Sequence, residues 1–143
     1  MKLFTKIIVL FFIGMSMSFT SNAQGSYHKS NLSISAGLAI GLNANINYEY
    51  RITDNSFISA GYGKLASMSV IPHIDLTHVF LKGDGNHFFE FGYGVIFVNP
   101  IDLVAVFPNI RLGYRKLNDY NSSFFRTGIS VSEGIYLGFG RSF

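Results

Sequence analysis

Apolar and polar residues alternate along most of this 143-residue chain. From Asn43 to Ile52, every second side chain is apolar or aromatic, and the positions between them hold three asparagines, a glutamate and an arginine. A period of two is typical of a β-strand with two unlike faces. Similar alternation, weaker in three of the segments, recurs over residues 32–40, 56–64, 70–81, 89–97, 104–115, 122–131 and 135–143. The sequence therefore predicts eight strands.

Turn-forming residues separate these segments, as in Thr53-Asp54-Asn55, Gly83-Asp84-Gly85-Asn86, Asn99-Pro100 and Asn118-Asp119-Tyr120-Asn121. No stretch between the strands is long enough for a crossover helix, so consecutive strands are expected to pair antiparallel as an up-and-down meander. Each strand has about ten residues, which is the length a tilted strand needs to cross a bilayer. We expect an all-β fold, an eight-stranded antiparallel up-and-down transmembrane β-barrel.

The two faces of the strands separate a membrane barrel from a soluble one. One face carries large aliphatic and aromatic side chains, including tyrosines suited to the membrane interfaces; these are Tyr48, Tyr50, Tyr62, Tyr93 and Tyr114. The other face is small or polar and suits a narrow lumen. In the alternative, a soluble lipocalin-like periplasmic carrier, Ile46, Phe91 and Leu112 would instead surround a cavity. We expect the apolar face to point outward into lipid.

Two prolines interrupt this pattern, because proline cannot donate an N–H to a sheet ladder and a closed barrel has no free edge. We expect Pro72 to lie close to a strand end. At Pro108 we expect a bulge or a gap in the ladder.

The first 23 residues have the order of a secretory signal peptide. Two lysines precede an apolar run from Ile7 to Phe19, and small residues at Ser21 and Ala23 predict cleavage before Gln24. The apolar run is shorter than the roughly 20 residues of a spanning helix. We therefore expect a signal peptide over residues 1–23 and one barrel domain over residues 24–143, with both mature termini in the periplasm.

Composition narrows the possible functions further. With 48% hydrophobic and 13% charged residues, the chain is not disordered, and without cysteine it can carry neither a disulfide nor a cysteine-linked lipid. The formal charge of +3 includes two lysines of the signal peptide, so the mature chain is nearly neutral. No basic patch indicates a nucleic-acid partner.

Charged residues on the polar face predict a structural ion-pair lattice in the lumen. Folding the strands about their turns places Glu90 opposite Arg111, and Arg111 opposite Arg126. Buried charges are tolerated when each head group finds a partner. Four further residues are expected to extend the lattice: Glu49, Arg51, Asp75 and Arg115. Because side chains fill a barrel of eight strands, we expect no open pore. The alternative is that the charged residues form a path for protons or ions.

The sequence predicts no catalytic residue, metal ligand or cofactor. The histidines at 28, 73, 78 and 87 are scattered without the paired spacing of a metal site. A lipid-modifying enzyme of the lipid A acyl hydrolase or transferase kind remains the alternative, and its candidate residues near the extracellular ends are His73, Asp75, Ser67, Ser69, Ser132 and Glu133. That alternative requires His73 to reach a serine hydroxyl.

Four segments carry a family resemblance: Gly85–Gly94, Ile110–Arg115, Ser123–Gly128 and Leu137–Phe143. They resemble the small outer-membrane β-barrel proteins of Gram-negative bacteria, of the OmpA-like and OmpX-like eight-stranded type. The resemblance implies a cell outer membrane location and a C-terminal Phe143 that is presented to the barrel-insertion machinery. Arg141 departs from the usual apolar pattern, and we expect it at the periplasmic rim, where it can reach water.

These expectations converge on a small outer-membrane barrel with a filled lumen. Its partners would be outer-membrane lipid, the insertion machinery and a membrane protein at the extracellular rim. The outer connections are short and rather apolar, as at Gly41-Leu42, which disfavours an adhesin or receptor. The predicted role is structural, in membrane integrity, or as a partner subunit.

Overall fold

The computed structural model describes residues 29–66, 70–99, 104–118 and 122–143, and all regular structure in these ranges is β-strand. The eight strands are β1 (Ser30–Leu38), β2 (Leu42–Thr53), β3 (Ser56–Ala66), β4 (Val70–Asp84), β5 (His87–Val98), β6 (Ala105–Asn118), β7 (Ser123–Ser130) and β8 (Gly134–Ser142). No helix in these ranges is long and apolar enough to span a membrane. The predicted signal peptide and its cleavage site between Ala23 and Gln24 lie outside the described residues.

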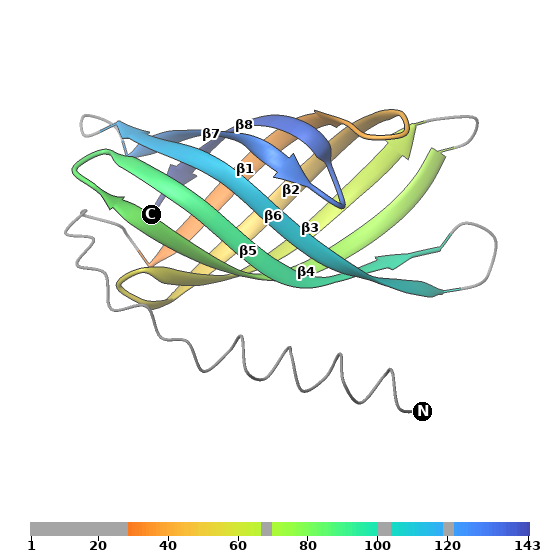
Figure 1. Cartoon of the computed structure of the whole chain (residues 1–143), viewed down its shortest axis with the longest axis horizontal. Coiled ribbons are helices and arrows are strands. Elements are labelled where there is room, and N and C mark those ends of the chain that lie inside the picture. The colour runs from red at the N-terminus through yellow and green to blue at the C-terminus, as the bar shows by residue number, and fades with distance from the viewer. Residues whose placement is uncertain (1–28, 67–69, 100–103, 119–121) are drawn as a thin grey trace.

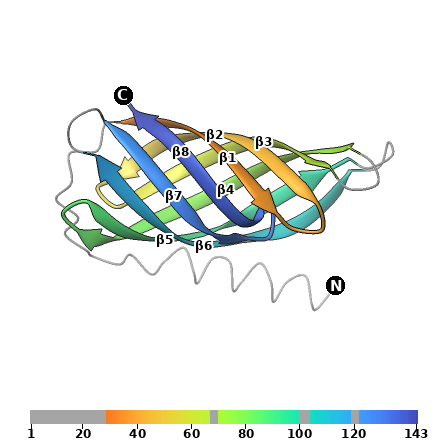
Figure 2. The same cartoon turned by 90° about the horizontal axis from the view of Figure 1, so that it is seen from above.

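Each strand pairs antiparallel with its neighbours in sequence, and β1 pairs with β8 to close the barrel (Figures 1 and 2). At the seam, the Ser30 N–H donates to the Phe143 carbonyl at 3.1 Å. The predicted eight-stranded antiparallel up-and-down barrel is therefore confirmed. Strand limits shift slightly: β1 ends at Leu38 because the Ala39 N–H turns to the Gly41 carbonyl, and β4 continues to Asp84 because its hairpin turn is tight.

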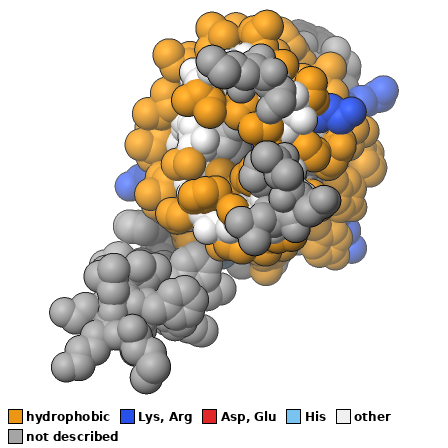
Figure 3. All heavy atoms as spheres, turned by 90° about the vertical axis from the view of Figure 1, so that its right-hand side faces the viewer, with side chains coloured by type: hydrophobic (Ala, Val, Ile, Leu, Met, Phe, Trp, Pro, Cys, Tyr) orange, Lys and Arg blue, Asp and Glu red, His pale blue; other side chains and the backbone are white. Residues whose placement is uncertain are grey.

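The apolar face points outward, as the alternation predicts. Ile46, Phe91 and Leu112 have 46%, 39% and 37% of their surface exposed, so they do not surround a cavity. Figure 3, which views the barrel from the end away from Phe143, shows a surface dominated by hydrophobic side chains with isolated Lys and Arg groups. A soluble carrier would bury these side chains, and the lipocalin-like alternative is therefore wrong.

The lumen is not polar throughout, which the sequence analysis missed. At the end that holds Phe143, inward-facing apolar side chains form a plug; its members are Phe57, Val79, Leu81, Phe88 and the partly buried Leu117. They come from strands β3 to β6, and the first four are almost fully buried. This apolar plug fills the β3 to β6 side of the lumen, and buried polar residues of β1 and β8, among them Asn31 and Ser142, lie at the same end.

Both prolines lie where a missing N–H costs little. Pro72 is the third residue of β4, close to the strand end as predicted, and the pairing of β4 with β5 begins only at His73. Pro108 pairs with Val95 of β5 in continuous register, so no bulge occurs there. The ladder gap lies on the β7 side of β6, because the pairing of β6 with β7 begins only at Arg111.

The strands have unequal lengths, which makes the end away from Phe143 uneven. β7 and β8 have 8 and 9 residues, whereas β4 and β6 have 15 and 14. Along the barrel axis, the β7–β8 turn therefore lies nearer to the Phe143 end than the ends of the longer strands do (Figures 1 and 2). Residues 105–110 of β6 have no ladder partner on β7.

Two adjacent phenylalanines test the orientation of the faces. Phe88 points into the apolar plug with 1% of its surface exposed, and Phe89 points outward with 56% exposed. We expect Phe88→Ala to lower the free energy of unfolding by about 3–5 kcal/mol, because it leaves a cavity in a packed site. Phe89→Ala, the matched control, should lower it by clearly less because lipid fills the space. Urea titration in lipid vesicles measures both, and equal losses would contradict the assigned orientation.

Candidate functional site in the barrel lumen

Next to the apolar plug, charged side chains from five strands and one turn meet inside the barrel. We call these residues the lumen lattice: Glu49 on β2, Asp75 on β4, Glu90 on β5, Arg111 and Arg115 on β6, Arg126 on β7 and Glu133 in the β7–β8 turn, with Tyr136 on β8 beside them. The seven charged side chains are fully buried. Alternation places them in the lumen, because each lies on the polar face of its strand.

Arg115 is the most densely paired member. Its Nη1 and Nη2 donate to the two carboxylate oxygens of Glu49 at 2.7 and 2.8 Å, which is a bidentate pair. Its Nη2 and Nε also donate to Glu90 Oε2 at 2.6 and 2.9 Å. One guanidinium therefore joins carboxylates from β2 and β5 across the lumen. Such charge-assisted bonds fix geometry more strictly than neutral hydrogen bonds do.

Arg126 and Arg111 extend the network toward the other end. Arg126 Nη1 donates to Glu49 Oε1, and its Nη2 to Glu133 Oε2, both at 3.3 Å. Arg111 Nη2 donates to the same Glu133 oxygen at 3.3 Å. Arg111 also lies within ion-pair distance of Glu90 at 3.7 Å and of Asp75 at 3.8 Å.

Neutral groups support the charged ones. Asn31 Nδ2 donates to Glu49 at 3.1 Å, and the Ser35 hydroxyl donates to Glu133. The Tyr136 hydroxyl lies 3.4 Å from Glu90 Oε1, and the Arg126 guanidinium carbon lies 5.0 Å from the centre of the Tyr136 ring. The rings of the apolar end also contribute, because the guanidinium carbon of Arg115 is 4.7 Å from the Phe124 ring.

The structure corrects the predicted register of this site. Glu90 is opposite Gly113, not Arg111, and Arg111 is opposite Gly92 and Ser130. Arg126 is opposite Arg115 rather than Arg111. The turn after β5 was expected at Pro100, but β6 begins only at Ala105, and the longer connection shifts the pairing by two residues. An even shift keeps the side chains on the same face, so the charged groups still meet in the lumen.

One predicted member of the lattice lies elsewhere. Arg51 is near the β2–β3 turn, where its Nη2 pairs with Asp54 Oδ1 at 2.9 Å. Arg51 is opposite Phe57, a member of the apolar plug, so it lies level with that plug and not with the lumen lattice. Arg51 belongs to the rim and not to the lumen lattice.

Glu133 is a member that sequence reasoning placed at the rim. The shortness of β7 and β8 lowers their turn into the barrel, and the Glu133 N–H donates to Ser130 Oγ at 2.9 Å. Gly134 has a φ of +70°, which favours glycine. A Cβ on Gly37 would approach the Glu133 carbonyl oxygen to 2.1 Å, so the absent side chain makes room for the turn. The signal in the sequence that could have placed Glu133 in the lumen was the small residue Gly37 on the neighbouring strand β1.

Farther from the apolar plug, the lumen is lined by uncharged polar groups. Asn109 Nδ2 donates to Thr77 Oγ1 at 3.0 Å, whereas His73 Nε2 and Asp75 Oδ2 are buried without a hydrogen-bond partner. Among the described residues, His73 Nε2 bonds to no serine hydroxyl, and the candidate serines Ser67 and Ser69 lie outside the described residues. Within the described residues, no three His, Asp or Glu side chains are placed to hold a metal ion.

Fold and lumen together define a class: a closed eight-stranded transmembrane β-barrel whose interior is filled by its own side chains. No protein-family model and no curated protein sequence matches the chain. Among solved structures it is similar to the N-terminal β-barrel domain of Pseudomonas aeruginosa OprF, with a TM-score of 0.69, 15% identity, and coverage of 82% of this chain and 100% of that chain. It is also similar to a de novo designed transmembrane β-barrel, with a TM-score of 0.69, 10% identity, and coverage of 83% and 98%.

Removing Arg115 should destabilise the barrel strongly. Arg115→Met leaves Glu49 and Glu90 without their closest cation, and breaking a buried pair in this way costs about 3–5 kcal/mol of unfolding free energy. Arg141→Met, at an exposed arginine on β8, is the control and should change stability little. The measurement is denaturant unfolding in lipid vesicles.

A second variant separates lost charge pairing from lost packing. Arg115→Met combined with Glu49→Gln and Glu90→Gln removes the unpaired carboxylates and should recover much of the stability. If the single variant were as stable as the Arg141 control, the lattice would have no structural role.

Proposed function

We propose that this chain is a small outer-membrane β-barrel protein of the OmpA-like or OmpX-like type, and that its barrel has a structural role in membrane integrity. The observation that carries this proposal is the occlusion of the lumen. A barrel that conducts needs a continuous polar path, and an enzyme needs an assembled set of reacting groups. In the described residues, Arg115 and its partners Glu49 and Glu90 span the lumen.

Occlusion is twofold. At the end near Phe143, the apolar plug fills the lumen on the side of strands β3 to β6. Next to it, the lumen lattice joins strands from opposite sides of the wall, with Arg115 bound to both Glu49 and Glu90. An ion that passed would have to break buried ion pairs and then pass beside apolar side chains, each of which is unfavourable.

Several features support an outer-membrane location. The predicted signal peptide would export the chain, and Phe143, which follows β8, would be presented to the insertion machinery. The outward cations Lys82, Lys116 and Arg141 gather at the end where β1 begins and β8 ends. Positive side chains at a membrane interface favour anionic head groups, which suits a periplasmic placement of that end.

We expect the purified barrel to pass no ions in planar lipid bilayers, because its lumen is filled. Cells that lack the chain should become more sensitive to detergent, and the wild-type chain should restore resistance. The Arg115→Met variant, with its weakened barrel, should restore it less well than Arg141→Met at equal membrane abundance. Steady single-channel currents from the wild-type protein would contradict the structural role and favour a path through the lumen.

The uneven rim favours a second role, as a partner subunit. Residues 105–110 of β6 present an edge without a β7 partner, and Val106 on its outer face is 56% exposed. On its lumen side, Phe107 is 51% exposed although it lies on the inward face. An unpaired edge with apolar residues on both faces suits the addition of an extended strand from another membrane protein.

Photo-crosslinking tests this second role. A benzophenone amino acid in place of Phe107 should give one discrete protein adduct in intact membranes, because a docked strand lies within reach. The same substitution at Phe139, a lipid-facing position with 64% exposure, should give none and serves as the control. An absence of protein adducts at position 107, or the same adducts at both positions, would rule out a strand partner at this edge.

A further inference from the structure

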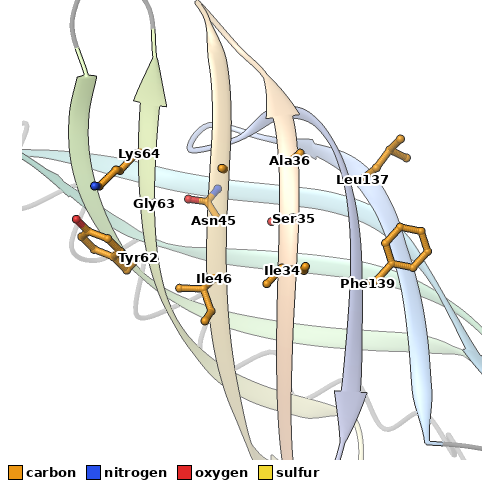
Figure 4. Close-up of a pocket in the computed structure, with 11 residues that line it drawn as sticks. Ile34, Ser35, Ala36, Asn45, Ile46, Tyr62, Gly63, Lys64, Leu137 and Phe139 are labelled. Atoms are coloured by element: carbon orange, nitrogen blue, oxygen red, sulfur yellow. The ribbon is translucent and has the colours of Figure 1, made fainter.

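A groove of about 530 Å³ crosses the outer surface of strands β8, β1, β2 and β3 (Figure 4). Its position follows from a local lack of bulk on the lipid-facing side. Ala36 and Ala44 lie directly opposite each other on β1 and β2, in a surface built mostly from large apolar side chains. Two small residues side by side expose the wall of the barrel between their neighbours.

Two rows of paired residues define the groove. The floor runs across the strands in the order Leu137, Ala36, Ala44 and Lys64, each opposite the next. One step nearer to Phe143, the second row forms a taller side in the order Phe139, Ile34, Ile46 and Tyr62. On the other side of the floor, the next pair across β1 and β2 is Leu38 and Leu42, which are 62% and 68% exposed. The groove is therefore apolar along its length.

A cation marks one end of this apolar groove. Lys64 is outward and exposed, two residues before the end of β3. Within the part of the chain that the structure describes, no acidic side chain forms an ion pair with it. In Figure 4 the Tyr62 hydroxyl points to the same side as the Lys64 ammonium, which adds a second hydrogen-bond donor there. The other outward cations of the strands lie toward Phe143.

We infer that this groove binds one phosphorylated lipid, with an acyl chain over Ala36 and Ala44 and a phosphate at Lys64. The inference rests on the barrel spanning a membrane, and it adds a defined ligand site to the proposed structural role. Its basis is complementarity: an apolar channel suits an alkyl chain, and an exposed ammonium near the strand end suits an anion at head-group depth.

A lipid fits these features better than the alternatives do. Water gains little in an apolar groove whose surroundings are hydrocarbon. A second copy of this chain would have to bring an anion to Lys64, but the outward faces of the described strands carry a carboxylate only at Asp84, in the turn at the opposite end. A phosphorylated lipid supplies the chain and the anion in one molecule.

Retention of spin-labelled lipids by the full-length mature barrel in phosphatidylcholine vesicles tests the inference. The probes are phosphatidic acid and diacylglycerol with identical chains, so that they differ only in the phosphate. We expect the wild-type barrel to immobilise phosphatidic acid about fivefold better, as one lysine near a membrane surface provides. Lys64→Gln should abolish this preference, and Lys116→Gln, which removes an outward cation at the other end, should leave it unchanged.

A groove-filling variant tests the acyl part separately. Ala44→Leu should lower the retention of both probes severalfold while Lys64 stays in place. The heat-dependent gel migration of each variant confirms that the barrel has folded. Equal retention of both probes by the wild type, or an unchanged preference in Lys64→Gln, would overturn the inference. So would a dimer in native mass spectrometry that Ala44→Leu dissociates without any change in retained lipid.

These outcomes are distinguishable from failure of the proposed function. Ion conduction by the wild-type barrel would overturn the structural role but would not change lipid retention, because the lumen and the groove lie on opposite faces of the wall. Loss of the phosphate preference in Lys64→Gln, with the lumen still closed, would establish the lipid site alone.

Discussion

The pairing of three buried guanidiniums with four carboxylates is the constraint on which the rest of this barrel depends. A wall whose outer face must be apolar can carry its charges only inside, and there each charge needs a partner within a few ångströms. Arg115 meets this need most fully, because it bridges Glu49 and Glu90 from different sides of the lumen. The lattice thus ties the strands together through the interior, in addition to the ladders that close the wall.

The lumen contains two neighbouring regions, the charged lumen lattice and the apolar plug. Phe57 and Phe124 face Arg115 from the apolar end, with its guanidinium carbon 5.9 and 4.7 Å from the ring centres. Aromatic faces accept a cation while excluding water, so the boundary between the layers is itself favourable. A low local dielectric then strengthens the ion pairs on the other side of that boundary. The same layering places the ion pairs where they contribute most to the stability of the barrel.

Periodicity alone predicted the eight strands, their antiparallel order and the outward apolar face, because in a closed barrel one face of every strand meets lipid. It could not give the register, which depends on the lengths of connections, and the late start of β6 displaced Arg111 from Glu90 to Gly92. It also could not show that the short β7–β8 hairpin lowers Glu133 into the lumen. Arg51 was misplaced because alternation does not give the depth of a residue in the lumen: Arg51 lies opposite Phe57 of the apolar plug and pairs with Asp54 of the adjacent turn.

The outward face is less uniform than its alternation suggests, because the size of its side chains varies and the register determines which of them are neighbours. Large side chains cover most of it, and the two alanines at positions 36 and 44 are opposite each other only because β1 and β2 share a tight turn. A pair of small residues in one strand would be filled by its neighbours, whereas a pair across two strands leaves a continuous depression. With Lys64 next in the same row, the position of a single hairpin turn determines both the shape of the groove and the charge at its end. The lipid-facing surface is therefore specified by register as closely as the lumen is.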